Sequence, residues 1–234
     1  MPFKEKPRLT IHRETLVDRL VQLLQESILS GNLKPKTKLS EAQVAKEFGV
    51  SRAPAREALQ RLEEMNLIRK NHLGREVAEF SPDEFQQIYE LKNVVEAFGA
   101  MKGALKAKEE EMAGIQSVLG RMEQCILSGD LTRLRYLNYE FHDLLVSCCQ
   151  NKKLIETYQS LVKQVRWATS LSLELPARPE ESFREHREIF EAFQHKDAEK
   201  VRVLLEVHSN ANLNRILSQM ESKGETHHVV PHQA

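Results

Sequence analysis

Residues 40–58, SEAQVAKEFGVSRAPAREA, constrain the fold of this 234-residue chain more than any other stretch. Ser40 and Gln43 form a capping-box pattern, in which each side chain can satisfy an orphan amide at a helix start. Gly49 can adopt the left-handed backbone conformation of a sharp turn, and Ser51 can cap a following helix. The stretch therefore predicts a helix, a tight turn and a second helix.

Arg52 and Arg56 lie four residues apart at the start of that second helix, so they share one of its faces. Pro54 is compatible with this position, because amides in the first turn have no internal acceptor. In a helix-turn-helix protein this end of the second helix contacts base edges, and an arginine fork can bond two acceptors on guanine or a phosphate. The arginines therefore predict a DNA-reading helix, with an ordinary solvated face as the alternative.

Two short strands are predicted after this helix. The runs LIRKN and EVAEF carry β-branched and aromatic residues, and they flank HLGR, in which Gly74 favours a hairpin turn. Apolar residues at helical spacing over residues 15–30 supply a third helix in front. Three helices and two strands make a winged helix, and His72 and Arg75 would lie at the tip of the wing, near DNA or merely exposed.

The remainder of the chain has helical patterns. Ser81, Pro82 and Glu84 combine a cap, a first-turn proline and a capping-box acid, so a second domain should begin at about Ser81. Its first helix should reach about Ala107. The apolar residues expected to point inward from that helix are Ile88, Leu91, Val95, Phe98 and Leu105. Five more helices are predicted at residues 109–128, 131–149, 151–174, 181–195 and 197–221.

The predicted fold is mainly α: a winged-helix domain at residues 1–80, an all-helical bundle at 81–221 and a disordered tail at 222–234. Formal net charge is zero, but residues 1–80 hold 15 Lys and Arg against 11 Asp and Glu, so this part suits a polyanion. No apolar run could span a membrane or serve as a secretory signal, which predicts a cytoplasmic protein. The three cysteines lack C-x-x-C spacing and predict buried thiols.

Three histidines fall on the apolar stripes of three different predicted helices: His142, His186 and His208. Asn138 precedes His142 by four residues and shares its face. Neutral imidazoles converging from separate helices can hold a divalent metal, and an amide oxygen can add a fourth ligand. The alternative for each histidine is a hydrogen-bonded core residue, which is the commoner role of a single inward histidine.

The run SGNLKPKTKLSEAQVAKEFGVSRAPAREALQRLEEMNLIRKNHLGREV resembles the winged-helix domain of GntR-type bacterial transcription regulators, and G-V-S-R-x-P-x-R-E-A-L is its most specific part. The resemblance covers about residues 15–80. It implies that the recognition helix and the wing contact DNA through Ser51, Arg52, Ala53, Pro54, Arg56, His72, Gly74 and Arg75. Ala55 stands where many relatives have valine, which should alter packing rather than function.

The predicted bundle domain resembles the FCD ligand-binding domain of the FadR-like branch of these regulators. In that domain D-x-x-F-H, E-H-x-x-I and a later histidine supply metal ligands, which by position implies Asn138, His142, His186 and His208 here. Asn138 replaces the more usual Asp, and the lost negative charge should weaken the site. Lys92 stands where relatives commonly have arginine, so an effector carboxylate would meet a point charge rather than a fork.

These features predict a homodimeric transcription regulator, either a repressor or an activator. It would bind a pseudo-palindromic operator in double-stranded DNA and sense a small molecule, an organic acid. Its cofactor would be a divalent metal, with zinc or nickel preferred. Without a metal, Arg166 and the three histidines would donate hydrogen bonds to the effector. One alternative is a metal-dependent hydrolase, for which no inward carboxylate is placed to act as general base. The other is an architectural DNA-binding protein, which leaves the polar cluster without a purpose.

Overall fold

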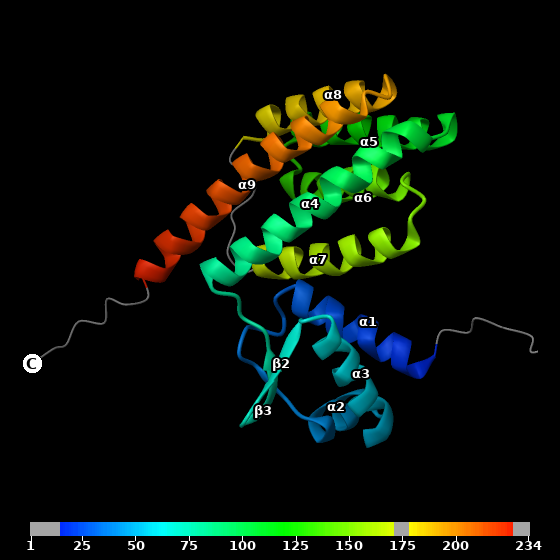
Figure 1. The fold of residues 1–234 in the computed structure, drawn as a ribbon. Helices are drawn as coiled ribbons and strands as arrows, with labels where there is room; N and C mark the ends of the chain where they lie inside the picture. The colour runs from blue at the N-terminus through cyan, green and yellow to red at the C-terminus, as the bar shows by residue number, and fades with distance from the viewer. Residues whose placement is uncertain (1–14, 171–177, 227–234) are drawn as a thin grey trace, which may run out of the picture. The chain divides into compact units, whose positions relative to one another are not determined.

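The computed structural model describes residues 15–170 and 178–226 (Figure 1). The chain divides into two units, Met1–Ala78 and Glu79–Ala234, where the sequence placed the domain boundary after residue 80. The described residues form nine helices and one small sheet, so the predicted mainly α fold is confirmed. None of the described helices is long and apolar enough to cross a membrane.

The N-terminal unit is a winged helix. Its elements are α1 (Leu16–Leu29), β1 (Lys38–Leu39), α2 (Glu41–Phe48), α3 (Arg52–Glu64), β2 (Ile68–Asn71) and β3 (Gly74–Val77). The strands form one antiparallel sheet in the order β1-β3-β2, with Arg75 of β3 between Leu39 of β1 and Lys70 of β2. The two-residue strand β1 was not predicted, because a run so short has no periodicity to detect.

Local caps set the turn between α2 and α3. The Ser40 hydroxyl accepts from the amide of Gln43, whose side chain accepts in return from the Ser40 amide, so the predicted capping box is confirmed. Gly49 ends α2 with a φ of 65°, the left-handed conformation expected for the sharp turn. Ser51 occupies the N-cap position of α3, but its side chain makes no capping hydrogen bond, so that part of the prediction is wrong.

The buried face of α3 decides which of its residues face solvent. Ala55, Leu59 and Leu62 are fully buried within the N-terminal unit. Arg52 and Arg56 lie on the exposed side of the same helix, one turn apart. Ala55, the position at which GntR-type regulators often have valine, therefore lies in the core.

The C-terminal unit is a bundle of helices. They are α4 (Pro82–Lys106), α5 (Glu109–Ser128), α6 (Leu131–Ser147), α7 (Lys152–Ser170), α8 (Pro179–Gln194) and α9 (Ala198–Thr226). Ser81 and Glu84 form the predicted capping box of α4. Residues 222–226, which the sequence analysis assigned to the tail, are the last residues of α9. Residues 171–174, predicted as helix, and 227–234, predicted as tail, lie outside the described residues.

Helix α4 buries only part of the side that the sequence predicted to point inward, since Ile88 and Val95 are partly buried. Leu91, Phe98 and Leu105 were expected inside, yet they are exposed. The buried side carries aromatic, small and charged residues, among them Phe85, Tyr89, Lys92, Glu96, Ala100 and Gly103. Both sides of α4 contain apolar residues, so periodicity could not decide between them. The packing of α6, α7 and α9 along α4 makes the choice (Figure 1).

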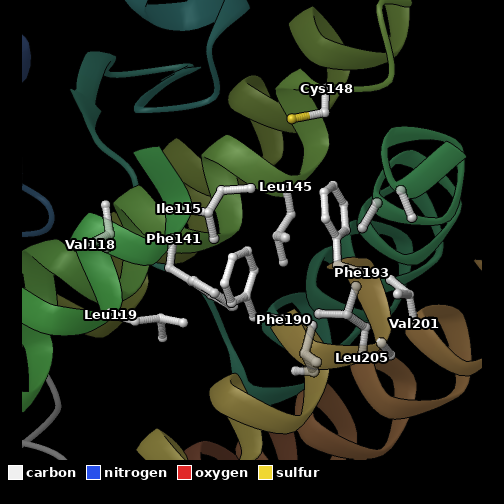
Figure 2. Packing of buried hydrophobic residues seen from close by; sticks show 14 of the residues in the cluster. Ile115, Val118, Leu119, Phe141, Leu145, Cys148, Phe190, Phe193, Val201 and Leu205 are labelled. Carbon is white, nitrogen blue, oxygen red and sulfur yellow. The ribbon is translucent and has the colours of Figure 1, made fainter. Parts of the chain in front are cut away.

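The main core of the bundle lies between α4, α5, α6, α8 and α9 (Figure 2). Phe141 and Leu145 of α6 are fully buried there with Ile115 of α5 and Phe193 of α8. The cysteines are buried and unpaired, as predicted: Cys125, Cys148 and Cys149. Burial raises the pKa of the Cys148 thiol to about 12, so this thiol stays protonated and serves packing.

Gly103 brings α4 close to α6. A Cβ added there would lie 2.4 Å from the Leu145 carbonyl oxygen and 3.1 Å from Cβ of Cys148. We expect Gly103→Ala to lower the free energy of unfolding by about 1–3 kcal/mol, because the backbone must shift. Gly120→Ala is the control: a Cβ there meets nothing within 4 Å, so better helix propensity should stabilise by up to about 1 kcal/mol. Urea unfolding measures both, and equal midpoints would contradict this close contact.

Candidate functional site

The exposed start of α3 collects most of the residues predicted to contact DNA. Ser51, Arg52, Ala53 and Arg56 are exposed there, and Pro54 is partly buried. The two arginines extend from the N-terminal turns of α3, the end that a recognition helix presents to the major groove. The structure therefore brings the predicted recognition residues together on one accessible surface.

The wing presents His72 but not Arg75. His72 and Gly74 are exposed around the turn between β2 and β3, as the sequence placed them. The side chain of Arg75 is 16% exposed, and its Nε donates to Glu63 at 3.0 Å. Since β3 already begins at Gly74, Arg75 lies within the sheet instead of at the wing tip where the sequence placed it.

His142 of α6, His186 of α8 and His208 of α9 converge inside the bundle. All three are buried, and their candidate ligand nitrogens lie within 4.8 Å of one another. Nε2 of His186 is 3.2 Å from Nε2 of His142, and the ring centroids of His186 and His208 are 4.7 Å apart. Three imidazoles from three separate helices therefore face one point.

Two carboxylates orient these rings. Nδ1 of His142 lies 2.8 Å from Oε1 of Glu96, and Nδ1 of His208 lies 2.5 Å from Oε2 of Glu185. Each carboxylate favours a proton on the nearby Nδ1, which leaves the lone pair of a neutral ring on Nε2. Nε2 of His208 accordingly accepts from the side-chain amide of Asn212 at 3.0 Å. The sequence predicted no inward carboxylate beside the histidines, and for Glu96, which is buried and lines the same cavity, that expectation is wrong.

Burial keeps two of the rings neutral. Burial, followed by the neighbouring rings of His208 and His142, lowers the pKa of His186 well below the usual histidine value. Burial also lowers the pKa of His208, against the opposing effect of its hydrogen bond to Glu185. Nδ1 of His186 is buried with no hydrogen-bond partner among the described residues. A neutral imidazole is the form that ligates a metal, so these two rings are ready to bind one near neutral pH.

Glu96 is the centre of a buried polar network. Its carboxylate is 1% exposed and lies near four donors: Nζ of Lys92 at 2.5 Å, Nδ1 of His142 at 2.8 Å, and the hydroxyls of Ser209 at 3.2 Å and Tyr158 at 3.3 Å. Burial would raise the pKa of Glu96, but Lys92 and then His142 hold it well below its usual range, so the carboxylate is ionised. The i, i+4 spacing from Lys92 was the available sequence signal.

A cavity of about 180 Å³ lies beside the histidines. Lys92 and Asn138 line it together with the three rings, so these predicted residues share one site. Arg166 is not among the described residues that line the cavity. Its guanidinium carbon instead lies 4.7 Å from the ring centroid of Tyr139, as a cation–π contact.

The cavity carries an excess of positive charge. Lys92, Arg135 and Arg215 line it, and Glu96 is the one carboxylate among its described lining residues. Three cationic side chains thus face a single carboxylate among these lining residues, and Lys92 is the one that pairs with it. Arg215 also donates to Asn212 at 2.6 Å, and this holds its guanidinium close to the histidine cluster. An anion is therefore the ligand that the cavity suits.

A winged helix with exposed arginines, joined in one chain to a bundle with a polar, positively charged cavity, defines a class of protein: a ligand-responsive DNA-binding regulator. Residues 16–74 match the bacterial regulatory proteins of the gntR family, and residues 87–211 match the FCD domain. The chain therefore belongs to the GntR family and carries an FCD domain. It is a transcription regulator and not an enzyme, so the hydrolase alternative is wrong.

Proteins of similar sequence are bacterial transcription regulators. The chain is 29% identical over 204 residues to the uncharacterized HTH-type transcriptional regulator YdhC of Bacillus subtilis, covering 86% of this chain and 91% of that protein. It is 27% identical over 184 residues to the HTH-type transcriptional repressor RspR of Escherichia coli, covering 78% and 81%. The solved structure of E. coli McbR/YncC shares the fold, with a TM-score of 0.73 at 22% identity over 88% of this chain and 98% of that one.

Arg52→Ala should weaken operator binding by ~1–3 kcal/mol per site, the range for losing a good base or phosphate contact. The probe is a duplex that the wild-type protein selects from a random pool, titrated as a labelled fragment. Arg19→Ala removes an equal charge from an exposed position of α1 and should bind like wild type. Wild-type affinity in a folded Arg52→Ala variant would contradict the assignment of α3 as the recognition helix.

Proposed function

We propose that the protein is a homodimeric repressor in the cytoplasm. An organic acid bound in its FCD cavity controls its affinity for a pseudo-palindromic operator. The convergence of three buried histidines beside an anion-binding cavity carries this proposal, because such a cluster can hold a divalent cation for a carboxylate ligand. The similarity to RspR, which is named a repressor, supports repression. The proposed DNA contacts come from Ser51, Arg52, Ala53, Pro54, Arg56, His72 and Gly74.

The donor set fits a cation such as zinc or nickel. Ligands about 2.0–2.1 Å from a zinc ion lie about 3.3–3.4 Å from one another at the tetrahedral angle. The Nε2 atoms of His142 and His186 are 3.2 Å apart. Glu96 and Glu185 are the outer carboxylates that commonly orient metal-bound histidines. His208 would join by exchanging its present hydrogen bond at Nε2 for the cation.

Asn138 and the effector would complete the coordination. Asn138 lines the cavity one turn before His142 on α6 and offers an amide oxygen. A bound cation supplies positive charge and open positions for a carboxylate oxygen. Lys92, Arg135 and Arg215 face the same cavity. Its volume of about 180 Å³ suits a small organic acid, since about 150 Å³ accommodates a benzene ring.

Removing the metal should lower the thermal stability of the protein. A ligand present at 100 times its Kd stabilises by ~2.7 kcal/mol, which corresponds to about 5–10 °C for a chain of this size. We expect EDTA to lower the Tm of the zinc-loaded protein by that amount, and His186→Ala to abolish the response. Asn138→Asp should enlarge it, because a carboxylate attracts the cation more strongly than an amide does. Scanning calorimetry with and without zinc and EDTA measures each shift.

His195→Ala is the matched control, since His195 is an exposed histidine at the end of α8. It should keep the full EDTA response. If zinc and nickel leave the wild-type melt unchanged and elemental analysis finds no metal, the metal part of the proposal fails. The cavity would then bind the carboxylate through hydrogen-bond donors alone, and Asn138→Asp should destabilise the fold by placing an uncompensated charge near the interior.

The apolar side of α4 supports the homodimer. Exposed apolar residues follow this side at helical spacing: Leu91, Val94, Phe98 and Leu105. Val203 and Val207 are exposed on α9, the helix that packs along α4 (Figure 1). An exposed apolar surface of this kind marks an interaction site. An operator with two-fold symmetry is bound by a protein dimer with the same symmetry. In such a dimer the same face of each copy makes the contact, and the apolar side of α4 could provide that face.

Val94→Asp should dissociate the dimer. Val94 is 67% exposed, so the monomer should still fold while the new charge disrupts an apolar contact between copies. Light scattering should give twice the 27.0 kDa chain mass for wild type and the single-chain mass for the variant. Leu127→Asp, at a 76% exposed position of α5, is the control and should stay dimeric. A monomeric wild type at micromolar concentration, with and without DNA, would contradict the proposal.

A further inference from the structure

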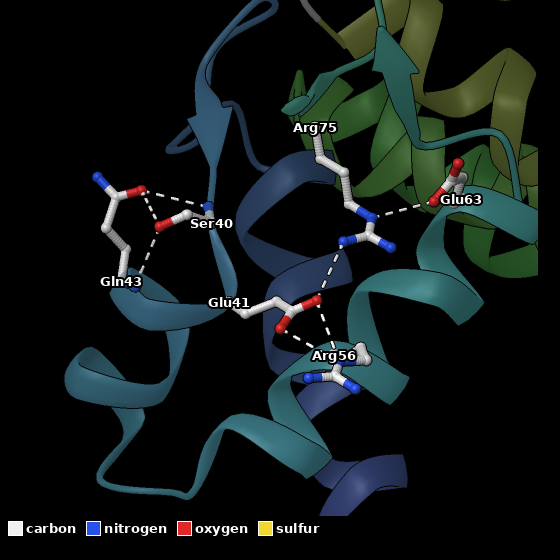
Figure 3. Close-up of polar contacts among 6 residues, drawn as sticks. All are labelled: Ser40, Glu41, Gln43, Arg56, Glu63 and Arg75. Carbon is white, nitrogen blue, oxygen red and sulfur yellow. Dashed lines mark hydrogen bonds and ion pairs between the residues drawn. The ribbon is translucent and has the colours of Figure 1, made fainter. Parts of the chain in front are cut away.

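The carboxylate of Glu41 links both helices of the helix-turn-helix to the wing (Figure 3). Glu41 is the first residue of α2, where the capping box of Ser40 and Gln43 fixes the backbone. Both of its oxygens accept from Nε of Arg56 on α3, at 3.2 Å each. Nη1 of Arg75 on β3 lies 3.5 Å from Oε1 of the same carboxylate. One side chain of α2 therefore contacts the proposed recognition helix and the wing at once.

The two arginines of this network differ in exposure: Arg75 is mostly buried and Arg56 is exposed. Arg75 is largely buried and also donates to Glu63 at 3.0 Å, so it holds Glu41 from the side of the sheet. The side chain of Arg56, by contrast, is 58% exposed. Two arginines and two glutamates balance one another in charge. Arg56 is thus the member of the network that can reach a partner outside the chain.

The contact with Glu41 occupies one edge of the Arg56 guanidinium. Nε is engaged, whereas neither Nη nitrogen donates a hydrogen bond within the described part of the chain. The Nη1–Nη2 edge of a guanidinium matches two acceptors, such as O6 and N7 of guanine or two phosphate oxygens. Ordering a long side chain on binding weakens affinity. A carboxylate on Nε restricts Arg56 before DNA arrives and leaves the recognition edge available.

We propose that Glu41 is a positioning residue for sequence recognition, which holds Arg56 so that its Nη edge points toward a base. This inference rests on the proposed DNA-binding role of Arg56. A carboxylate at this place also repels phosphates, which disfavours binding to DNA of any sequence. Glu41 therefore improves discrimination between sequences while it lowers non-specific affinity.

Glu41→Gln tests this role, because it keeps the shape of the side chain and removes its charge. The probes are a duplex that the wild-type protein selects from a random pool and a scrambled duplex of the same composition, titrated at one salt concentration. We expect about tenfold weaker binding to the selected duplex and unchanged or tighter binding to the scrambled one. The ratio of the two Kd values, that of the scrambled duplex divided by that of the selected duplex, should therefore fall at least tenfold. A structural defect would weaken both equally and would overturn the proposal.

Glu57→Gln is the matched control for charge. It removes the same charge from the exposed side of α3, where Glu57 pairs with Arg61. The ratio of the two Kd values should stay at the wild-type value in this variant. A fall as large as that in Glu41→Gln would mean that net charge alone sets discrimination, and the proposal would be overturned.

Arg56→Ala separates the inference from the function on which it rests. In that background Glu41→Gln should cause no further loss of discrimination, because Glu41 acts through Arg56. If Arg56→Ala alone binds both duplexes like wild type, the DNA-binding role of Arg56 fails and the inference fails with it. If Arg56→Ala loses discrimination while Glu41→Gln keeps it, the role of Arg56 stands and only the positioning by Glu41 is overturned.

Discussion

The buried carboxylate of Glu96 is the interaction on which the arrangement of the FCD domain depends. Its donors come from four helices: Lys92 of α4, His142 of α6, Tyr158 of α7 and Ser209 of α9. Burying an ionised group is costly, and an apolar cluster of similar volume can be equally stable. Stability alone therefore does not account for Glu96. Its effect is on geometry, because one carboxylate gathers polar groups from four helices at a single point.

The same carboxylate connects the two ligands proposed for the cavity. Glu96 orients His142 through Nδ1 and neutralises Lys92. A ligand carboxylate that pairs with Lys92 would weaken the ion pair between Lys92 and Glu96. Glu96 would then be more negative beside Nδ1 of His142, so His142 would bind a cation more tightly. By linkage, the cation then strengthens the binding of the ligand by the same factor. Helix α4, which carries Glu96, directly follows the wing strand β3 in the chain, so it is also the covalent connection to the DNA-binding unit.

A feature could be predicted from the sequence when the residues that determine it lie close together along the chain. The capping boxes at Ser40 and Ser81 and the left-handed Gly49 depend on neighbours along the chain, and all three were predicted. The histidines were also predicted to point inward, because each falls on an apolar stripe. The Glu96 network was not, since its partners Tyr158 and Ser209 are 62 and 113 residues away. The buried side of α4 was mistaken for the same reason: its two faces are both partly apolar, and distant helices choose between them.

Asn138 changes the balance of charge in the proposed metal site. Three neutral imidazoles and an amide leave the charge of a dication uncompensated among its direct ligands, whereas the aspartate of related FCD domains would offset part of it. Glu96 and Glu185 contact the Nδ1 atoms of His142 and His208. They would therefore be separated from the cation by the imidazole rings and would not be its direct ligands. The anionic effector is then the nearest negative charge available to the cation. Such a site holds its metal more weakly alone than an aspartate site does, and it gains more when the organic acid arrives, so the asparagine favours joint binding of metal and effector over permanent occupancy by the metal.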